Sequence, residues 1–133
     1  MREFKFRMWE KDDKMIYFSD MMIDFLKDDK GAMQPTIIFK KDNFDGSCSL
    51  GGYCDIEQYT GRKDYNDNEI YEGDIIESID YHGKRKGIVI YSNGTYFLQG
   101  YDGYSDEYLF NQSDIVVIGN IHEHKELFKQ LQD

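Results

Sequence analysis

Short runs rich in β-branched and aromatic residues alternate with turn-forming residues throughout the second half of the sequence. Asn93-Gly94 is the strongest turn signal, because a two-residue hairpin turn needs positive φ at both central positions and these residues supply it at low cost. The spacing predicts a meander of short antiparallel strands. The strand candidates are residues 74–81, 87–91, 95–101, 108–110 and 114–118.

Five short strands leave two open edges if they form a flat sheet, and open edges invite pairing with other chains. A sheet that curls toward closure removes this liability. We therefore expect a mainly β fold whose core, residues 56–121, is a small, antiparallel, partly closed SH3-like barrel.

The N-terminal part predicts a β-hairpin followed by a variable loop over residues 1–55. Phe4, Phe6 and Met8 alternate with charged residues, and residues 15–18 form a second apolar run after a polar turn. Residues 21–26 fit either a strand or a short helical turn.

Two further segments complete this N-terminal part. Residues 36–39 are β-rich and predict a strand. Residues 42–52 have the composition of an exposed loop.

The C-terminal residues predict one short helix over residues 122–132. The segment has a helix-favouring Glu-Lys-Leu composition, and Leu127 and Leu131 are one turn apart. Asn120 is a candidate cap, and Glu123 and Glu126 would lie where the helix dipole favours acids.

Length and composition predict one domain over residues 1–133. The sequence is 40% apolar and 16% aromatic, which is too rich in core-forming side chains for a disordered chain. It has no run approaching the roughly 18 apolar residues of a membrane span, so we expect a cytoplasmic protein. Cys48 and Cys54 fit free thiols best, although a disulfide between them stays open.

Charge is distributed unevenly along the chain. Residues 1–66 hold 11 Lys/Arg against 13 Asp/Glu, a net charge of −2, whereas residues 67–133 hold 5 against 13, a net charge of −8. Such a field opposes nucleic acid and anionic membranes, because both require clustered cations. It favours a basic protein partner, for instance a host factor, and the candidate interaction surface is Glu72, Asp74, Glu77 and Asp80.

An alternative prediction starts from the basic cluster Lys84-Arg85-Lys86, which the turn pattern places at a hairpin tip. With the aromatic strands that follow, it would make a nucleic-acid contact on a small β-barrel. Charged residues at such a tip also serve solubility and guard sheet edges. A small β domain this rich in aromatic residues is also a candidate for a homo-oligomer.

The motifs that could carry chemistry are weak. Asp64-x-Asn66-x-Asn68 imitates the start of a calcium loop, but Glu69 stands where that loop needs glycine, so a polar turn is the better interpretation. His122-x-His124 has the wrong spacing for two ligands on one helix face. No nucleophile elbow or phosphate-binding loop is present in the sequence. We therefore predict no catalytic, cofactor or metal residues, and a function other than catalysis.

Four segments of the sequence, in order, resemble the YopX family: residues 2–9 (REFKFRMW), 58–64 (QYTGRKD), 69–76 (EIYEGDII) and 117–121 (VIGNI). The resemblance implies a protein of bacteriophages and prophages, mainly of Gram-positive bacteria, with a mainly β fold and no established activity. It brings no catalytic residues. The sequence departs from the family pattern at Arg62, at residues 65–68 and near Lys125.

Overall fold

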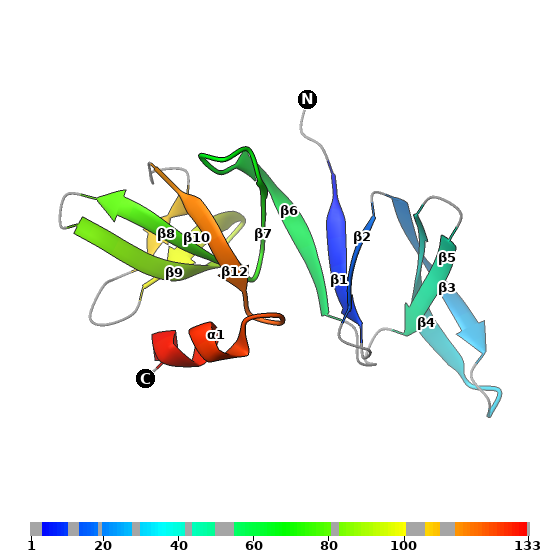
Figure 1. The fold of residues 1–133 in the computed structure, drawn as a ribbon. Helices are drawn as coiled ribbons and strands as arrows, with labels where there is room; N and C mark the ends of the chain where they lie inside the picture. The colour runs from blue at the N-terminus through cyan, green and yellow to red at the C-terminus, as the bar shows by residue number, and fades with distance from the viewer. Residues whose placement is uncertain are drawn as a thin grey trace. The chain divides into compact units, whose positions relative to one another are not determined.

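The structure is a computed structural model that describes residues 4–10, 14–18, 20–27, 30–41, 44–49, 55–80, 83–100, 106–109 and 114–132. The described elements are antiparallel β-strands and one short C-terminal helix, so the mainly β prediction is confirmed (Figure 1). The chain forms two compact units, Glu3–Gln58 and Tyr59–Asp133. The expected single domain over residues 1–133 stays a prediction. Cys54 lies outside the described residues, so both alternatives for the cysteines stay open.

The first unit opens with the predicted hairpin. Strand β1 (Phe6–Glu10) pairs with β2 (Lys14–Phe18), and Phe6 lies opposite Phe18 with their rings stacked at 5.8 Å. On its other side, β1 pairs with the first residues of β6 (Asp55–Lys63). Because side chains alternate along a strand, one face of these strands gathers a small apolar cluster. Its members are Met8 and Phe18, with Phe6, Ile16 and Ile56 packed against them.

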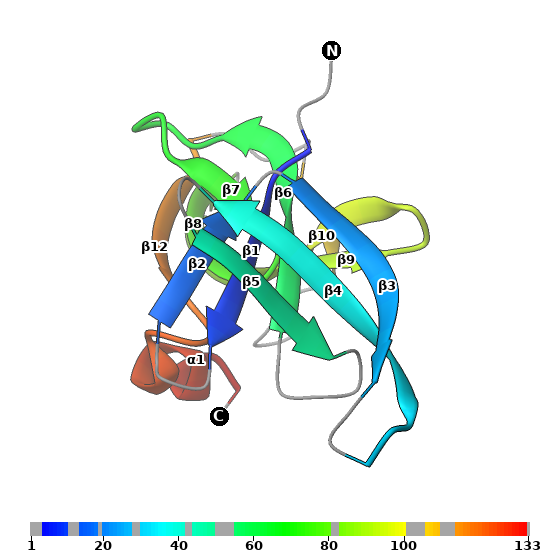
Figure 2. The ribbon, with the colours of Figure 1, turned by 90° about the vertical axis from the view of Figure 1, so that its right-hand side faces the viewer.

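A second sheet of the first unit contains β3 (Asp20–Lys27), β4 (Met33–Lys41) and β5 (Phe44–Ser49), in the order β3-β4-β5 (Figure 2). Residues 21–26 are therefore in a strand rather than a helical turn. The loop expected at residues 42–52 is wrong for residues 44–49, which pair with β4. Gly46 and Ser47 are weak strand formers, and pairing with a neighbouring strand overrides that local preference.

The second unit contains the rest of β6, β7 (Glu69–Tyr71), β8 (Asp74–Asp80), β9 (Gly83–Ser92), β10 (Thr95–Gln99), β11 (Glu107–Tyr108) and β12 (Val116–Asn120). Five of these strands form one sheet in the order β11-β10-β9-β8-β12. The predicted Asn93-Gly94 turn is confirmed, because φ is 51° and 83° at these residues and Ser92 pairs with Thr95.

The expected barrel closure is not found. Within the described part of the chain, no ladder joins β11 to β12, so the five-stranded sheet is open and the SH3-like assignment is not confirmed. The outer edge of β12 is instead occupied by the turn that follows β6. Val117 donates its backbone N–H to the Asp64 carboxylate, and the carbonyl of Ile115 accepts from the N–H of Tyr65. A turn therefore protects this sheet edge in place of another strand.

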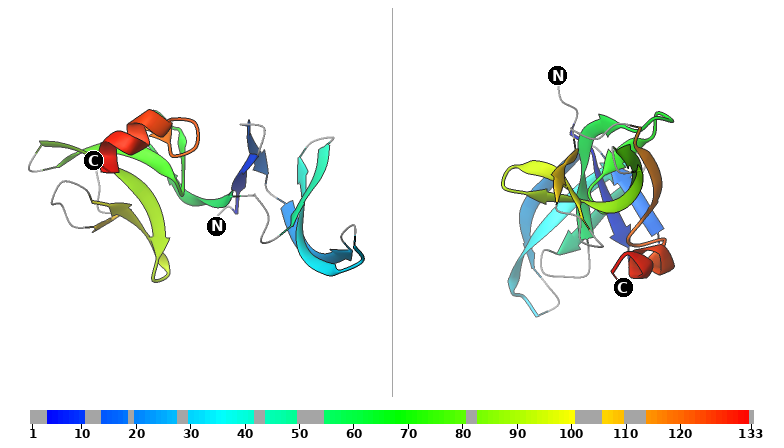
Figure 3. Two further views of the ribbon diagram at one scale, coloured as in Figure 1. Left: turned by 90° about the horizontal axis from the view of Figure 1, so that it is seen from below. Right: turned by 90° about the vertical axis from the view of Figure 1, so that its left-hand side faces the viewer.

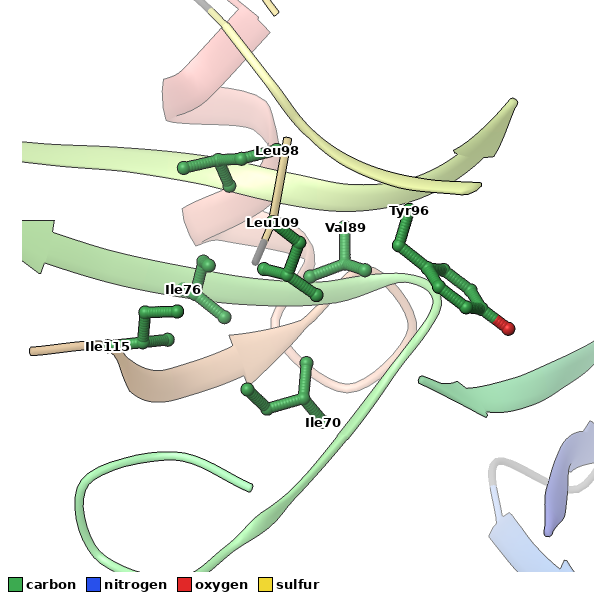
Figure 4. Close-up of a cluster of buried hydrophobic side chains, with 7 residues drawn as sticks. All are labelled: Ile70, Ile76, Val89, Tyr96, Leu98, Leu109 and Ile115. Carbon is green, nitrogen blue, oxygen red and sulfur yellow. The ribbon is translucent and has the colours of Figure 1, made fainter. Parts of the chain in front are cut away.

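The largest apolar cluster of the described second unit lies on one face of the five-stranded sheet. Gly87 permits this packing, because a Cβ there would lie 2.5 Å from Leu98 Cδ1 and 2.7 Å from the carbonyl oxygen of Gln99. Strands β9 and β10 leave no room for a side chain at Gly87, which explains the glycine at this position. Figure 4 shows the converging side chains of the cluster, which are Ile70, Ile76, Val89, Tyr96, Leu98, Leu109 and Ile115.

The predicted C-terminal helix is confirmed as α1 (Lys125–Gln132), which follows β12 through a short turn and packs beside it (Figure 3). It begins three residues later than expected, because residues 121–124 form a capped turn. Asn120 Oδ1 accepts from the N–H groups of His122 at 3.0 Å and Glu123 at 2.8 Å. In return, His124 Nδ1 accepts from the Asn120 N–H at 3.1 Å. In the described residues, no helix has the length and apolar character needed to cross a membrane.

Candidate functional site

The two candidate surfaces that the sequence suggested are neighbours on strands β8 and β9. In the register of this pair, Glu77 lies opposite Lys86 and Ile79 lies opposite Lys84. Residues opposite each other in an antiparallel pair share one face of the sheet and lie close together. Of the candidates, Glu77, Lys84 and Lys86 therefore share one face of the sheet instead of forming two separate sites.

Two of the three basic candidates are engaged with acids. Lys84 Nζ lies 3.7 Å from Glu77 Oε1, and Arg85 Nη1 lies 2.9 Å from Glu107 Oε1. All three residues belong to β9, so their expected position at a hairpin tip is not found. Because side chains alternate along β9, Lys84 and Lys86 are exposed while Arg85 points inward and is only 5% exposed. The cluster therefore presents two cations to solvent rather than three.

The four acidic candidates also differ in burial, so they do not form one exposed surface. Asp74 is 2% exposed, and its Oδ2 accepts from the backbone N–H of Tyr71 at 2.8 Å. This bond spans the turn between β7 and β8, where Gly73 has φ of 82°, so Asp74 fixes a turn and does not belong to a surface. Glu72 and Glu77 are half-buried, and Asp80 ends β8.

The best-defined polar site of the second unit is a carboxylate that the sequence suggested only as a polar turn. Asp64 follows β6 and is 7% exposed. Its Oδ1 accepts from the backbone N–H groups of Asn66 at 2.9 Å and Asn68 at 2.8 Å. Its Oδ2 accepts from the N–H of Val117 at 2.9 Å and from Asn68 Nδ2 at 3.3 Å. One side chain thus holds its own turn and the edge of β12.

The electrostatics of Asp64 follow from these bonds. Burial raises the pKa of this carboxyl, but the hydrogen bonds from Val117, Asn68 and Asn66 outweigh it and hold the pKa below its usual value. The group is therefore a carboxylate at neutral pH. Its oxygens accept hydrogen bonds from N–H donors, which stabilise the charged carboxylate and leave its oxygens unavailable to a cation. This agrees with rejecting the calcium-loop interpretation.

Backbone bonds fix the rest of this turn, residues 64–68. Asp64 N–H donates to the carbonyl of Asn68 at 2.8 Å, and Asp67 N–H donates to the carbonyl of Asp64 at 3.0 Å. Tyr65 N–H donates to the carbonyl of Ile115 at 2.8 Å. Tyr65 and Asp67 are nevertheless exposed. The Asp-x-Asn-x-Asn spacing was a usable signal for the turn itself, but it could not show that the turn docks on β12.

Arg62, one of the departures from the family pattern, has a defined structural role. Its Nη1 donates to the carbonyl of Leu109 at 2.5 Å, and its backbone N–H donates to Thr60 Oγ1 at 3.2 Å. Thr60 Oγ1 in turn donates to the carbonyl of Ile70 at 2.8 Å. Arg62 therefore ties the end of β6 to the segment after β11.

The two C-terminal histidines serve the turn before α1. His124 lies against Gly119, where an added Cβ would approach the ring to 2.8 Å, and its Nδ1 is occupied by the Asn120 N–H. Across the residues that the structure describes, no group of three or more His, Cys, Asp or Glu side chains is placed to hold a metal ion.

Comparisons with known proteins complete the description. The family model described as YopX protein matches residues 5–129. Among solved structures, the chain is similar to the crystal structure of protein EF1440 from Enterococcus faecalis, with 27% sequence identity and a TM-score of 0.57. That similarity covers 96% of this chain and 99% of the other. No curated protein matches the sequence.

Proposed function

Since the chain belongs to the YopX family, we propose that it is a non-enzymatic phage or prophage accessory protein that binds a basic protein partner in the bacterial cytoplasm. The acidic surface of the second unit would bind this partner, and a host protein is the natural candidate. Membership of the YopX family is the reason for proposing a phage or prophage protein. The proposed binding of a basic partner is based on the negative net charge of the second unit.

The charge of the second unit is the observation that carries the proposal. Residues 59–133 hold 7 Lys/Arg and 14 Asp/Glu, a net charge of −7. Lys84 and Arg85 pair with Glu77 and Glu107, so these two ion pairs are close to neutral and the net charge comes from the other acids of the unit. A field of this sign steers cationic partners and repels polyanions. The exposed acids in the described part of this unit are Asp67, Asp106, Asp114, Glu123 and Glu126.

The alternative function, nucleic-acid binding, has one observation in its favour. Lys84 and Lys86 are exposed and lie on one face of β9, as a phosphate contact would require. The burial of Arg85 and the pairing of Lys84 with Glu77 weaken this surface. We therefore rank it second.

A pull-down from a lysate of a Gram-positive host tests both functions. The bait would be the full chain, and an acid-neutralised variant would reduce the net charge of residues 59–133 from −7 to −3. That variant carries Asp67→Asn, Asp114→Asn, Glu123→Gln and Glu126→Gln, and the matched control carries Lys84→Gln and Lys86→Gln. We expect a basic protein that salt releases and that only the acid-neutralised variant loses. Retention of nucleic acid that only the lysine control abolishes would favour the alternative instead.

A further inference from the structure

We infer that Tyr65 is the anchor of the partner-binding surface and receives a lysine or arginine side chain from a basic segment of the protein partner. This inference rests on the proposed function and gives that surface a location. The candidate surface consists of Tyr65, Asp67 and Asp114.

The first argument is the exposure of Tyr65. Its side chain is 77% exposed, and the next highest value among the large apolar side chains that the structure describes is 60%, at Phe4 near the start of the chain. A tyrosine ring contributes large, rigid contact area with few rotatable bonds, which makes tyrosine a frequent anchor at protein interfaces. An exposed ring of this size adds little to the stability of the fold itself.

The second argument is that the backbone beneath Tyr65 is already fixed. The Tyr65 N–H donates to Ile115, and the preceding residue, Asp64, is held by four hydrogen bonds to its carboxylate. A partner would therefore not have to order this loop on binding. The entropic cost of ordering a binding loop lowers affinity, and here that cost is small. Tyr65 is therefore exposed on a turn whose backbone is already held in place by hydrogen bonds.

The third argument is the charge of the exposed residues near Tyr65 in the fold. Asp67 is two residues away on the same turn, and its side chain is 86% exposed. Asp114 is exposed and directly precedes Ile115, whose carbonyl Tyr65 contacts. Lys63 Nζ lies 3.9 Å from Asp67 Oδ1, but these side chains are 50% and 86% exposed, and such a solvated pair contributes little.

These features select a cationic occupant. The face of a tyrosine ring attracts an ammonium or guanidinium group, and the apolar stem of lysine or arginine can pack along the ring. The two aspartates add Coulomb attraction to the same group. An anionic or purely apolar segment would gain nothing from the aspartates, so the chemistry of the surface fits a basic segment.

The test is a titration of the isotope-labelled full chain with an arginine-rich peptide of about eight residues, followed by NMR. We expect chemical-shift changes at residues 64–68 and 114–117, and an affinity that Tyr65→Ala lowers by about two- to fivefold. Tyr65→Phe keeps the ring and should keep the affinity. Tyr91→Ala is the matched control, because Tyr91 is also exposed, at 53%, on strand β9 of the same unit.

The outcomes separate this inference from the proposed function. Salt-sensitive binding with shifts elsewhere, or with Tyr65→Ala equal to the wild type, would overturn the role of Tyr65 and leave the acidic binding function standing. No binding at about 20 mM salt, where screening is weak, would count against both. The spectrum of each variant shows directly whether it is folded.

Discussion

Replacing Asp64 with asparagine keeps the size of the side chain but removes the negative charge that four N–H groups share. Whichever way the new amide turns, its NH₂ group faces two donors and loses both bonds. If the NH₂ faces Val117, the Val117 N–H at the edge of β12 loses its hydrogen-bond acceptor. If it faces Asn66 and Asn68, the turn itself loosens.

The magnitude follows from these losses. A hydrogen bond to a charged group contributes about 1.5–3 kcal/mol, and the Asn68 side chain is exposed and can turn to water. We therefore expect Asp64→Asn to lower the free energy of unfolding by about 2–4 kcal/mol, the equivalent of one to two such bonds. Urea denaturation followed by circular dichroism would measure it.

The matched control is Asp67→Asn on the same turn. Asp67 is exposed and its only described ion pair, with Lys63, is long and solvated, so its replacement should change the unfolding free energy by less than about 0.5 kcal/mol. If Asp64→Asn were as mild as this control, the role given to the Asp64 carboxylate would be refuted.

Three further predictions concern the second unit. Because the pKa of Asp64 is lower in the folded chain than in the unfolded one, its contribution is complete above about pH 5 and is lost as the pH falls through the folded pKa; acid titration of unfolding should show this loss in the wild type and not in Asp64→Asn. Gly87→Ala would force a Cβ against Leu98 and should cost about 1–3 kcal/mol in thermal or urea unfolding, and a variant as stable as the wild type would contradict the tight approach. Asn120→Ala removes the cap before α1 and should cost about 0.5–2 kcal/mol with a loss of helical signal, whereas an unchanged helical signal would show that the cap is not needed.

Features with local signals could be predicted from the sequence. The Asn93-Gly94 turn requires two positive φ values that few other residue pairs supply, and the structure has them. The opening hairpin followed from a period-two pattern, and α1 followed from its helix-favouring composition, whereas Asn120 caps the turn before α1 rather than the helix itself. In each case neighbours in the chain determine the structure.

Features that depend on distant partners could not be predicted. Asp64 and Val117 are 53 residues apart, so the sequence indicated a polar turn but not the strand edge that it protects. Arg85 was expected at a hairpin tip from the turn pattern, whereas its pairing with Ser78 places it inside strand β9 with its side chain buried. Residues 44–49 form a strand only because β4 provides a ladder.

The binding affinity of the partner for the second unit tests the central proposal most directly. The dissociation constant of the most strongly captured host protein would be measured at about 50 and about 300 mM salt, for the wild type and the acid-neutralised variant. We predict that added salt and neutralisation each weaken binding by about tenfold or more. A dissociation constant unchanged by both would contradict an acidic, electrostatically guided binding surface.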